Sequence, residues 1–60
     1  MTNFTRQMED AAHQQLREAL AQGLTGDACV DAATTAIGRE HRALVERVWR
    51  ERFGVMGGAG

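Results

Sequence analysis

The fold of this chain is decided by residues 30–48, which read VDAATTAIGREHRALVERV. Mostly apolar side chains recur along this stretch at intervals of three or four residues: Val30, Ala33, Ile37, His41, Leu44 and Val48. Residues at this spacing stack on one face of an α-helix. Because no proline interrupts the stretch, the pattern predicts one long helix from about Gly26 to Phe53.

Gly38 is the weak point of this predicted helix. A glycine inside a helix costs about 1 kcal/mol relative to alanine, and the weak helix formers Thr34 and Thr35 stand shortly before it. A break at Gly38 would divide the stretch and produce three helices in the chain. No Ser, Thr, Asp or Asn follows Gly38 to cap a new helix. We therefore favour a single helix, bent at Gly38 if at all, and keep the three-helix domain as the alternative.

A shorter amphipathic helix is predicted upstream of this stretch. It begins near Asn3 or Thr5, both good N-cap residues. Its apolar face consists of Phe4, Met8, Ala11, Ala12, Leu16, Ala19 and Leu20. Gly23 followed by Leu24 fits a Schellman-type stop, and Thr25 is placed to cap the next helix. Since short connections favour antiparallel neighbours, the sequence predicts an all-α fold built as an antiparallel helical hairpin.

The small size of the chain predicts self-association. Sixty residues make at most one domain, which we place in residues 1–54, followed by a flexible glycine-rich tail in residues 55–60. A domain this small buries only about 60% of its unfolded surface and gains stability from disulfides, a metal or oligomerisation. A single cysteine, Cys29, excludes an intrachain disulfide. Because two helices cannot enclose a core, we expect the hairpin to dimerise into a four-helix bundle. The residues expected at the interface between copies are Phe4, Met8, Leu16, Leu20, Val30, Ile37, His41, Leu44 and Val48.

The composition is that of a globular protein, with 43% hydrophobic and 25% charged residues and a net charge of −1. His13, Cys29 and His41 do not fall at metal-ligand spacing, so we expect no metal and no cofactor. Cys29 lies in an alanine-rich segment, where a buried and inert thiol is the expected state. The sequence holds no paired carboxylates and no phosphate-binding loop, and we predict a binding protein and not an enzyme.

Five of the seven basic residues, all of them arginines, lie in residues 39–52. Arginines beside aromatic side chains are typical of the energetic centres of protein interfaces. The residues expected to bind another protein are Arg39, Arg42, Trp49, Arg50 and Phe53. The alternative is a nucleic-acid-binding regulator, DNA or RNA, that uses the arginines of residues 39–52. A helix-turn-helix alignment with Gly38 as the turn glycine fits poorly, because Arg39 and Arg47 occupy positions that should be apolar or buried.

The polar and acidic first ten residues are unlike a signal peptide, and no apolar run is long enough to cross a bilayer. Together with a single free thiol, these features predict a cytoplasmic protein. The chain is similar to the small plasmid RNA-binding hairpins that dimerise into four-helix bundles. The similarity lies in its length, in its outline of two helices joined by a short turn, and in the Phe53-Gly54 ending. That resemblance implies only that such a chain can form a stable symmetric dimer whose outer faces bind a partner. The expected function is that of a small homodimeric interaction or regulatory protein.

Overall fold

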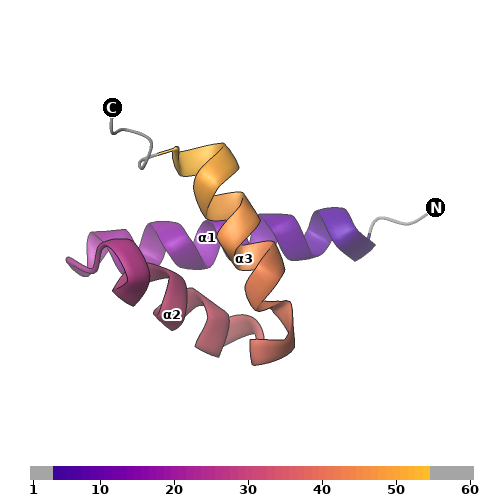
Figure 1. Ribbon diagram of the computed structural model, residues 1–60, viewed down its shortest axis with the longest axis horizontal. Coiled ribbons are helices and arrows are strands. Elements are labelled where there is room, and N and C mark those ends of the chain that lie inside the picture. The colour runs from indigo at the N-terminus through magenta and orange to yellow at the C-terminus, as the bar shows by residue number, and fades with distance from the viewer. Residues whose placement is uncertain (1–3, 55–60) are drawn as a thin grey trace.

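The computed structural model describes residues 4–54, and every regular element in that range is helical. The order is α1 (Phe4–Ala21), α2 (Gly26–Ile37), the 3-10 turn η1 (Arg39–His41), α3 (Arg42–Val48) and the π-helical turn η2 (Trp49–Phe53). Figure 1 shows α1 and α2 as an antiparallel hairpin, with α3 crossing α1 near its middle. The predicted all-α class is therefore confirmed. The tail predicted for residues 55–60 lies outside the described residues.

The connection between α1 and α2 is the predicted Schellman-type turn. Gly23 has a φ of +95°, a value that favours glycine. The amide of Leu24 donates to the carbonyl of Ala19, and the amide of Gly23 donates to that of Leu20. These two bonds occupy carbonyl groups that the end of a helix leaves without partners. Thr25 takes the predicted N-cap position of α2, although its side chain makes no capping hydrogen bond.

The single helix predicted for residues 26–53 is wrong, and the three-helix alternative is confirmed. Helix α2 ends at Ile37 because Gly38 adopts φ +123° and ψ +131°, a conformation that residues with a side chain rarely take. The amide of Gly38 donates to the carbonyl of Thr34 at 2.8 Å, and the amide of His41 donates to the carbonyl of Gly38 at 3.0 Å. These backbone bonds let η1 begin a new helical segment without a capping side chain.

The three helices enclose a small core to which each of them contributes. The buried hydrophobic residues are Ala12, Leu16, Ala19, Cys29, Val30, Ala33, Val45 and Val48. Leu24, Ala32, Ile37, Leu44, Trp49 and Phe53 are partly buried against them. Three of the eight core residues are alanines, so the helices bury little apolar volume.

One chain nevertheless forms a compact body. Its radius of gyration is 11.0 Å, close to the value of about 10 Å expected for a folded chain of this length. The reasoning that two helices cannot enclose a core does not apply, because the turn at Gly38 supplies a third helix. In the predicted hairpin a second copy would be required to cover the apolar stripe, whereas α3 covers part of it within the same chain.

Candidate functional site

Three of the nine residues expected between copies are covered by their own chain. Leu16, Val30 and Val48 belong to the core and are 0%, 5% and 2% exposed. No partner is required to bury them. The only large hydrophobic side chains exposed among the described residues are Phe4, at 64%, and Leu20, at 36%. The remaining four residues of the expected interface are half-buried: Met8, Ile37, His41 and Leu44.

Two arginines of the C-terminal segment bind α3 and η2 to α1. Arg47 forms an ion pair with Glu9, and Arg52 contacts the same carboxylate at 3.7 Å. Arg52 also lies 3.4 Å from Asp10. These pairs form because the break at Gly38 folds the C-terminal segment back across α1. Their role within the chain is to join two helices, which residue spacing along the sequence does not reveal.

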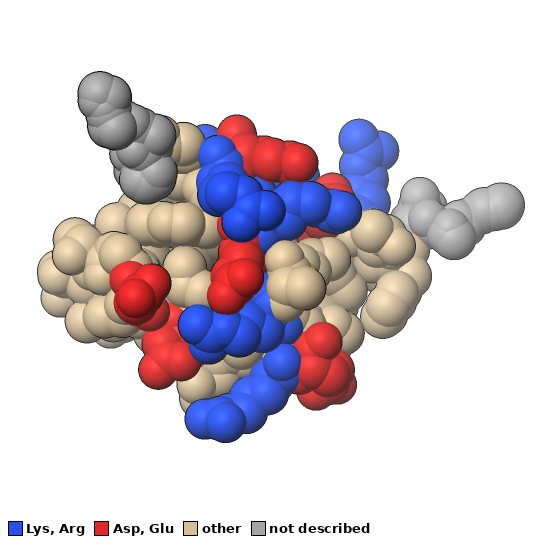
Figure 2. Space-filling model, in the orientation of Figure 1, with Lys and Arg blue, Asp and Glu red and all other residues tan. Residues whose placement is uncertain are grey.

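A third arginine connects α3 with α2. Arg42 donates to Glu46 at 2.9 Å and to Asp31 at 3.4 Å. The hydrogen bond to Glu46 and, to a smaller extent, the contact with Asp31 raise the pKa of Arg42 above its usual value. Arg39 and Arg50, the other two arginines predicted to bind a partner, form no ion pair with any residue in 4–54. Figure 2 accordingly shows arginines interleaved with carboxylates along α3 on this face of the molecule.

An aromatic row, formed by His13, Phe53 and Trp49, lies where η2 meets α1. The rings of Trp49 and Phe53 stack with centroids 5.3 Å apart and an interplanar angle of 25°. The ring of His13 extends the row, 5.0 Å from Phe53 at 33°. All three side chains are half-buried, and ring pairs of this kind contribute about 0.5–1.5 kcal/mol beyond the area they bury. Sequence reasoning missed His13, because its spacing places it on the polar side of α1 and only the path of α3 makes it an aromatic neighbour.

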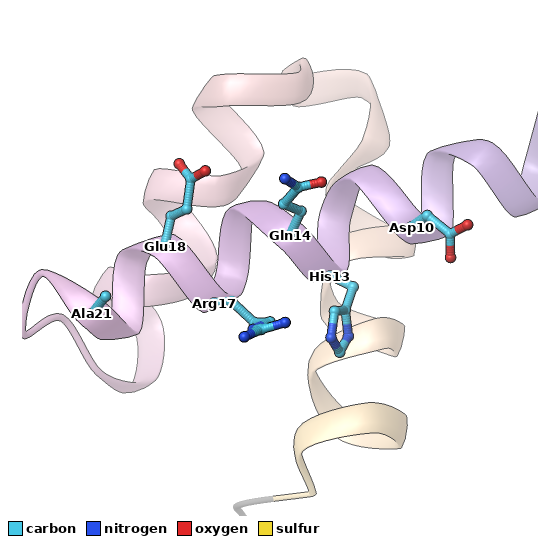
Figure 3. Close-up of a pocket in the computed structure, with 6 residues that line it drawn as sticks. All are labelled: Asp10, His13, Gln14, Arg17, Glu18 and Ala21. Atoms are coloured by element: carbon cyan, nitrogen blue, oxygen red, sulfur yellow. The ribbon is translucent and has the colours of Figure 1, made fainter.

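His13 also lines a surface depression of about 510 Å³ beside α1, with Asp10, Gln14, Arg17, Glu18 and Ala21. Figure 3 shows His13 and Arg17 projecting toward the side on which the C-terminal segment lies, whereas Gln14 and Glu18 project to the other side. The Nδ1 atom of His13 is buried and has no hydrogen-bond partner within residues 4–54. The row and the depression therefore meet at His13.

The thiol of Cys29 offers little chemistry in this fold. Cys29 is fully buried, and its Sγ donates to the backbone carbonyl of Leu16 at 3.4 Å. Burial raises the pKa of the thiol, which disfavours the thiolate that a nucleophile needs. The predicted burial of Cys29 is confirmed.

Within residues 4–54, no three His, Cys, Asp or Glu side chains gather closely enough to hold a metal ion. In the same part of the chain, no helix combines the length and the apolar character needed to cross a membrane. The chain finds no match among models of protein families, curated proteins or solved structures. The surface chemistry of the molecule is therefore the basis for proposing a function.

Proposed function

We propose that this chain is a small interaction module that binds another protein through the aromatic row and the arginine beside it, Arg50. The observation that carries the proposal is the row itself, in which His13, Phe53 and Trp49 lie half-exposed at the junction of two helices. Aromatic side chains and arginine dominate the binding energy of protein interfaces. Because the three rings hold one another in place, the side chains of this surface lose little conformational entropy when a partner binds.

The proposed surface is narrower than the set of partner-binding residues expected from the sequence. Arg50 is exposed, stands three residues before Phe53 and forms no ion pair within the described residues, so it is available to a partner. Arg42 is engaged by Glu46 and Asp31. Arg39 lies at the other end of the helical segment 39–53, where it lines a separate depression of about 270 Å³. We therefore centre the surface on Trp49, Arg50 and Phe53.

Nucleic-acid binding is the weaker of the two candidate functions. Three of the five arginines in residues 39–52 already face carboxylates of their own chain. The whole chain carries a net charge of −1, whereas proteins that bind phosphate backbones show a basic surface. A polyanion would have to displace Glu9, Asp10 and Asp31 from their arginines before these arginines contacted phosphate.

Affinity capture with exposed-residue variants tests the proposal. The immobilised wild type, Arg50→Glu and Arg39→Glu are compared in nuclease-treated extract; the two variants change the charge equally at opposite ends of the segment 39–53. Capture of the same protein by wild type and Arg39→Glu, with loss on Arg50→Glu, supports the proposal. Equal capture by all three chains contradicts it. In a parallel capture from untreated extract, retention that disappears on nuclease treatment and falls steeply with salt supports the nucleic-acid alternative.

Self-association remains part of the proposal in a modified form. The core is small and rich in alanine, and Phe4 stays 64% exposed, so a second copy that covers Phe4 would add apolar burial that one chain lacks. Light scattering over a dilution series measures this directly. Phe4→Asp should lower the average mass, while Gln7→Asp, an exposed polar position on the same helix, should not. The mass of a single chain at every concentration would contradict the dimer.

A further inference from the structure

The charge that is left without a partner beside the aromatic row is positive. Arg17 projects to the same side of α1 as His13 in Figure 3 and forms no ion pair with any described residue. Asp10, which lines the same depression, is paired with Arg52 at 3.4 Å. Glu18 also lines the depression and forms no ion pair with a described residue, but it projects to the opposite side of α1. Arg17 is therefore the uncompensated charge on this side of the depression.

The C-terminal side of the row adds a second cation of the same kind. Arg50 stands three residues before Phe53, close to one helical turn away, and forms no ion pair within residues 4–54. Glu51 stands two residues from both Trp49 and Phe53, and side chains at that spacing do not share a helix face. An acidic ligand would thus meet an arginine of α1 and an arginine of η2 beside the row, while Asp10 is neutralised by Arg52 and Glu18 projects to the opposite side of α1.

The spacing between the apolar and the charged contact matches one turn of helix. His13 and Arg17 are four residues apart in α1, which is a rise of about 6 Å. A helical segment with an apolar side chain three or four residues from a carboxylate presents both groups at this separation on one face. Arginine suits such a ligand because its guanidinium forms two parallel hydrogen bonds to a carboxylate.

We infer that the protein partner presents an acidic amphipathic segment, which places an apolar side chain against the His13–Phe53 end of the aromatic row and a carboxylate against Arg17. The inference rests on the proposed function and specifies the chemistry of the partner. Arg17 then acts as the residue that selects acidic over basic segments, a role that its position on the polar side of α1 does not reveal in the sequence.

Selection from a random peptide library displayed on phage tests this inference. The full chain is immobilised as wild type, Arg17→Glu and Arg39→Glu, and the last is the matched control because it reverses an exposed arginine at the far end of the segment 39–53. Pools selected by wild type and by Arg39→Glu should be enriched in Asp or Glu three or four residues from an aromatic or aliphatic residue. The pool selected by Arg17→Glu should lack this acidic bias.

Fluorescence of the chain's single tryptophan, Trp49, then measures binding of the most enriched peptide. Arg17→Glu should weaken binding by about tenfold or more, and replacing the acidic residue of the peptide by lysine should restore binding to that variant. Arg39→Glu should bind the original peptide as the wild type does. Circular dichroism checks that each exposed-residue variant retains the helical fold.

Two other outcomes distinguish failure of the acidic-segment inference from failure of the proposed function. Peptides that change Trp49 fluorescence but show no acidic bias, or that bind Arg17→Glu equally well, overturn the acidic-segment inference and leave the proposed binding surface standing. A selection in which no enriched peptide changes Trp49 fluorescence overturns both.

Discussion

Glu9 in α1 pairs with Arg47 in α3, although 38 residues separate them in the chain. The other oxygen of the same carboxylate lies 3.7 Å from Arg52. One acidic side chain therefore holds two positions of the C-terminal segment against α1. These arginines belong to the segment that suggested nucleic-acid binding in the sequence, and in the structure they join helices of one chain.

Replacing this carboxylate should have a small effect that depends on salt. We expect Glu9→Gln to lower the free energy of unfolding by about 0.5–1 kcal/mol at low ionic strength, because ion pairs near the surface contribute little and are screened. Urea unfolding at low and high salt measures the difference, which should shrink at high salt. Glu18→Gln, on the same helix with no ion pair among the described residues, is the control. An equal loss at both salt concentrations would contradict the ion-pair interpretation.

A substitution at Gly38 distinguishes a break at this residue from a continuous helix over residues 26–53. Its effect on the free energy of unfolding has opposite signs in the two cases. At φ +123°, an added Cβ would lie 3.0 Å from Oε1 of Glu40 and 3.3 Å from Cδ2 of His41. We expect Gly38→Ala to lower the free energy of unfolding by about 1–3 kcal/mol. In a continuous helix the same change would raise it by about 1 kcal/mol.

Urea denaturation measures this sign, and Gly26→Ala provides a graded comparison. Gly26 also has a positive φ, of +59°, but nothing lies within 4 Å of an added Cβ. We expect a loss of about 1–2 kcal/mol there, from backbone conformation alone. Stabilisation by Gly38→Ala would show that residues 26–53 form one helix in solution.

The two leucines in the second half of α1 should differ sharply in their contribution to stability. Leu16 is fully buried, and Leu16→Ala should cost about 2–5 kcal/mol, a large fraction of the stability expected for a chain this small. Leu20 is 36% exposed, so Leu20→Ala should cost much less. Thermal unfolding followed by circular dichroism compares the two. Equal losses would indicate that Leu20 is buried, for instance by a second copy of the chain.

Alkaline pH should destabilise the fold through Cys29. Burial raises the pKa of this thiol in the folded chain, so the unfolded chain loses the proton first as pH rises. The stabilisation is fully present below the pKa of the unfolded thiol and is lost as pH rises through the folded pKa. We expect the free energy of unfolding to fall above about pH 8.5, and Cys29→Ala to remove that part of the decline. Identical pH dependence in both chains would contradict the assignment.

The sequence predicted those parts of the structure that depend on local chemistry. The Schellman-type turn at Gly23 follows from glycine preferences and is confirmed. The start of α2 after Thr25 is confirmed in position, without the side-chain capping bond that predicted it. Gly54, with φ +49°, follows the end of η2 at Phe53, the residue at which the predicted helix also ends. The apolar face of the first helix also correctly contains Leu16.

The break at Gly38 differs from the favoured prediction because no capping side chain follows Gly38 in the sequence, whereas in the structure backbone hydrogen bonds on both sides of Gly38 take that place. This one error accounts for most of the others. Without the break there is no α3 to cross α1, and hence no reason to place His13 beside Phe53 or Arg47 beside Glu9. Periodicity places a side chain on a helix face, but the neighbour that faces it depends on where the chain turns.

The path of α3 across α1 also sets an order of assembly. The α1–α2 hairpin closes through a short turn, whereas the pair formed by Glu9 and Arg47 closes across 38 residues and carries a larger entropic cost of loop closure. We therefore expect the hairpin to form before α3 docks on it. Until then the core lacks Val45 and Val48, and apolar surface of the hairpin that α3 covers in the folded chain faces water.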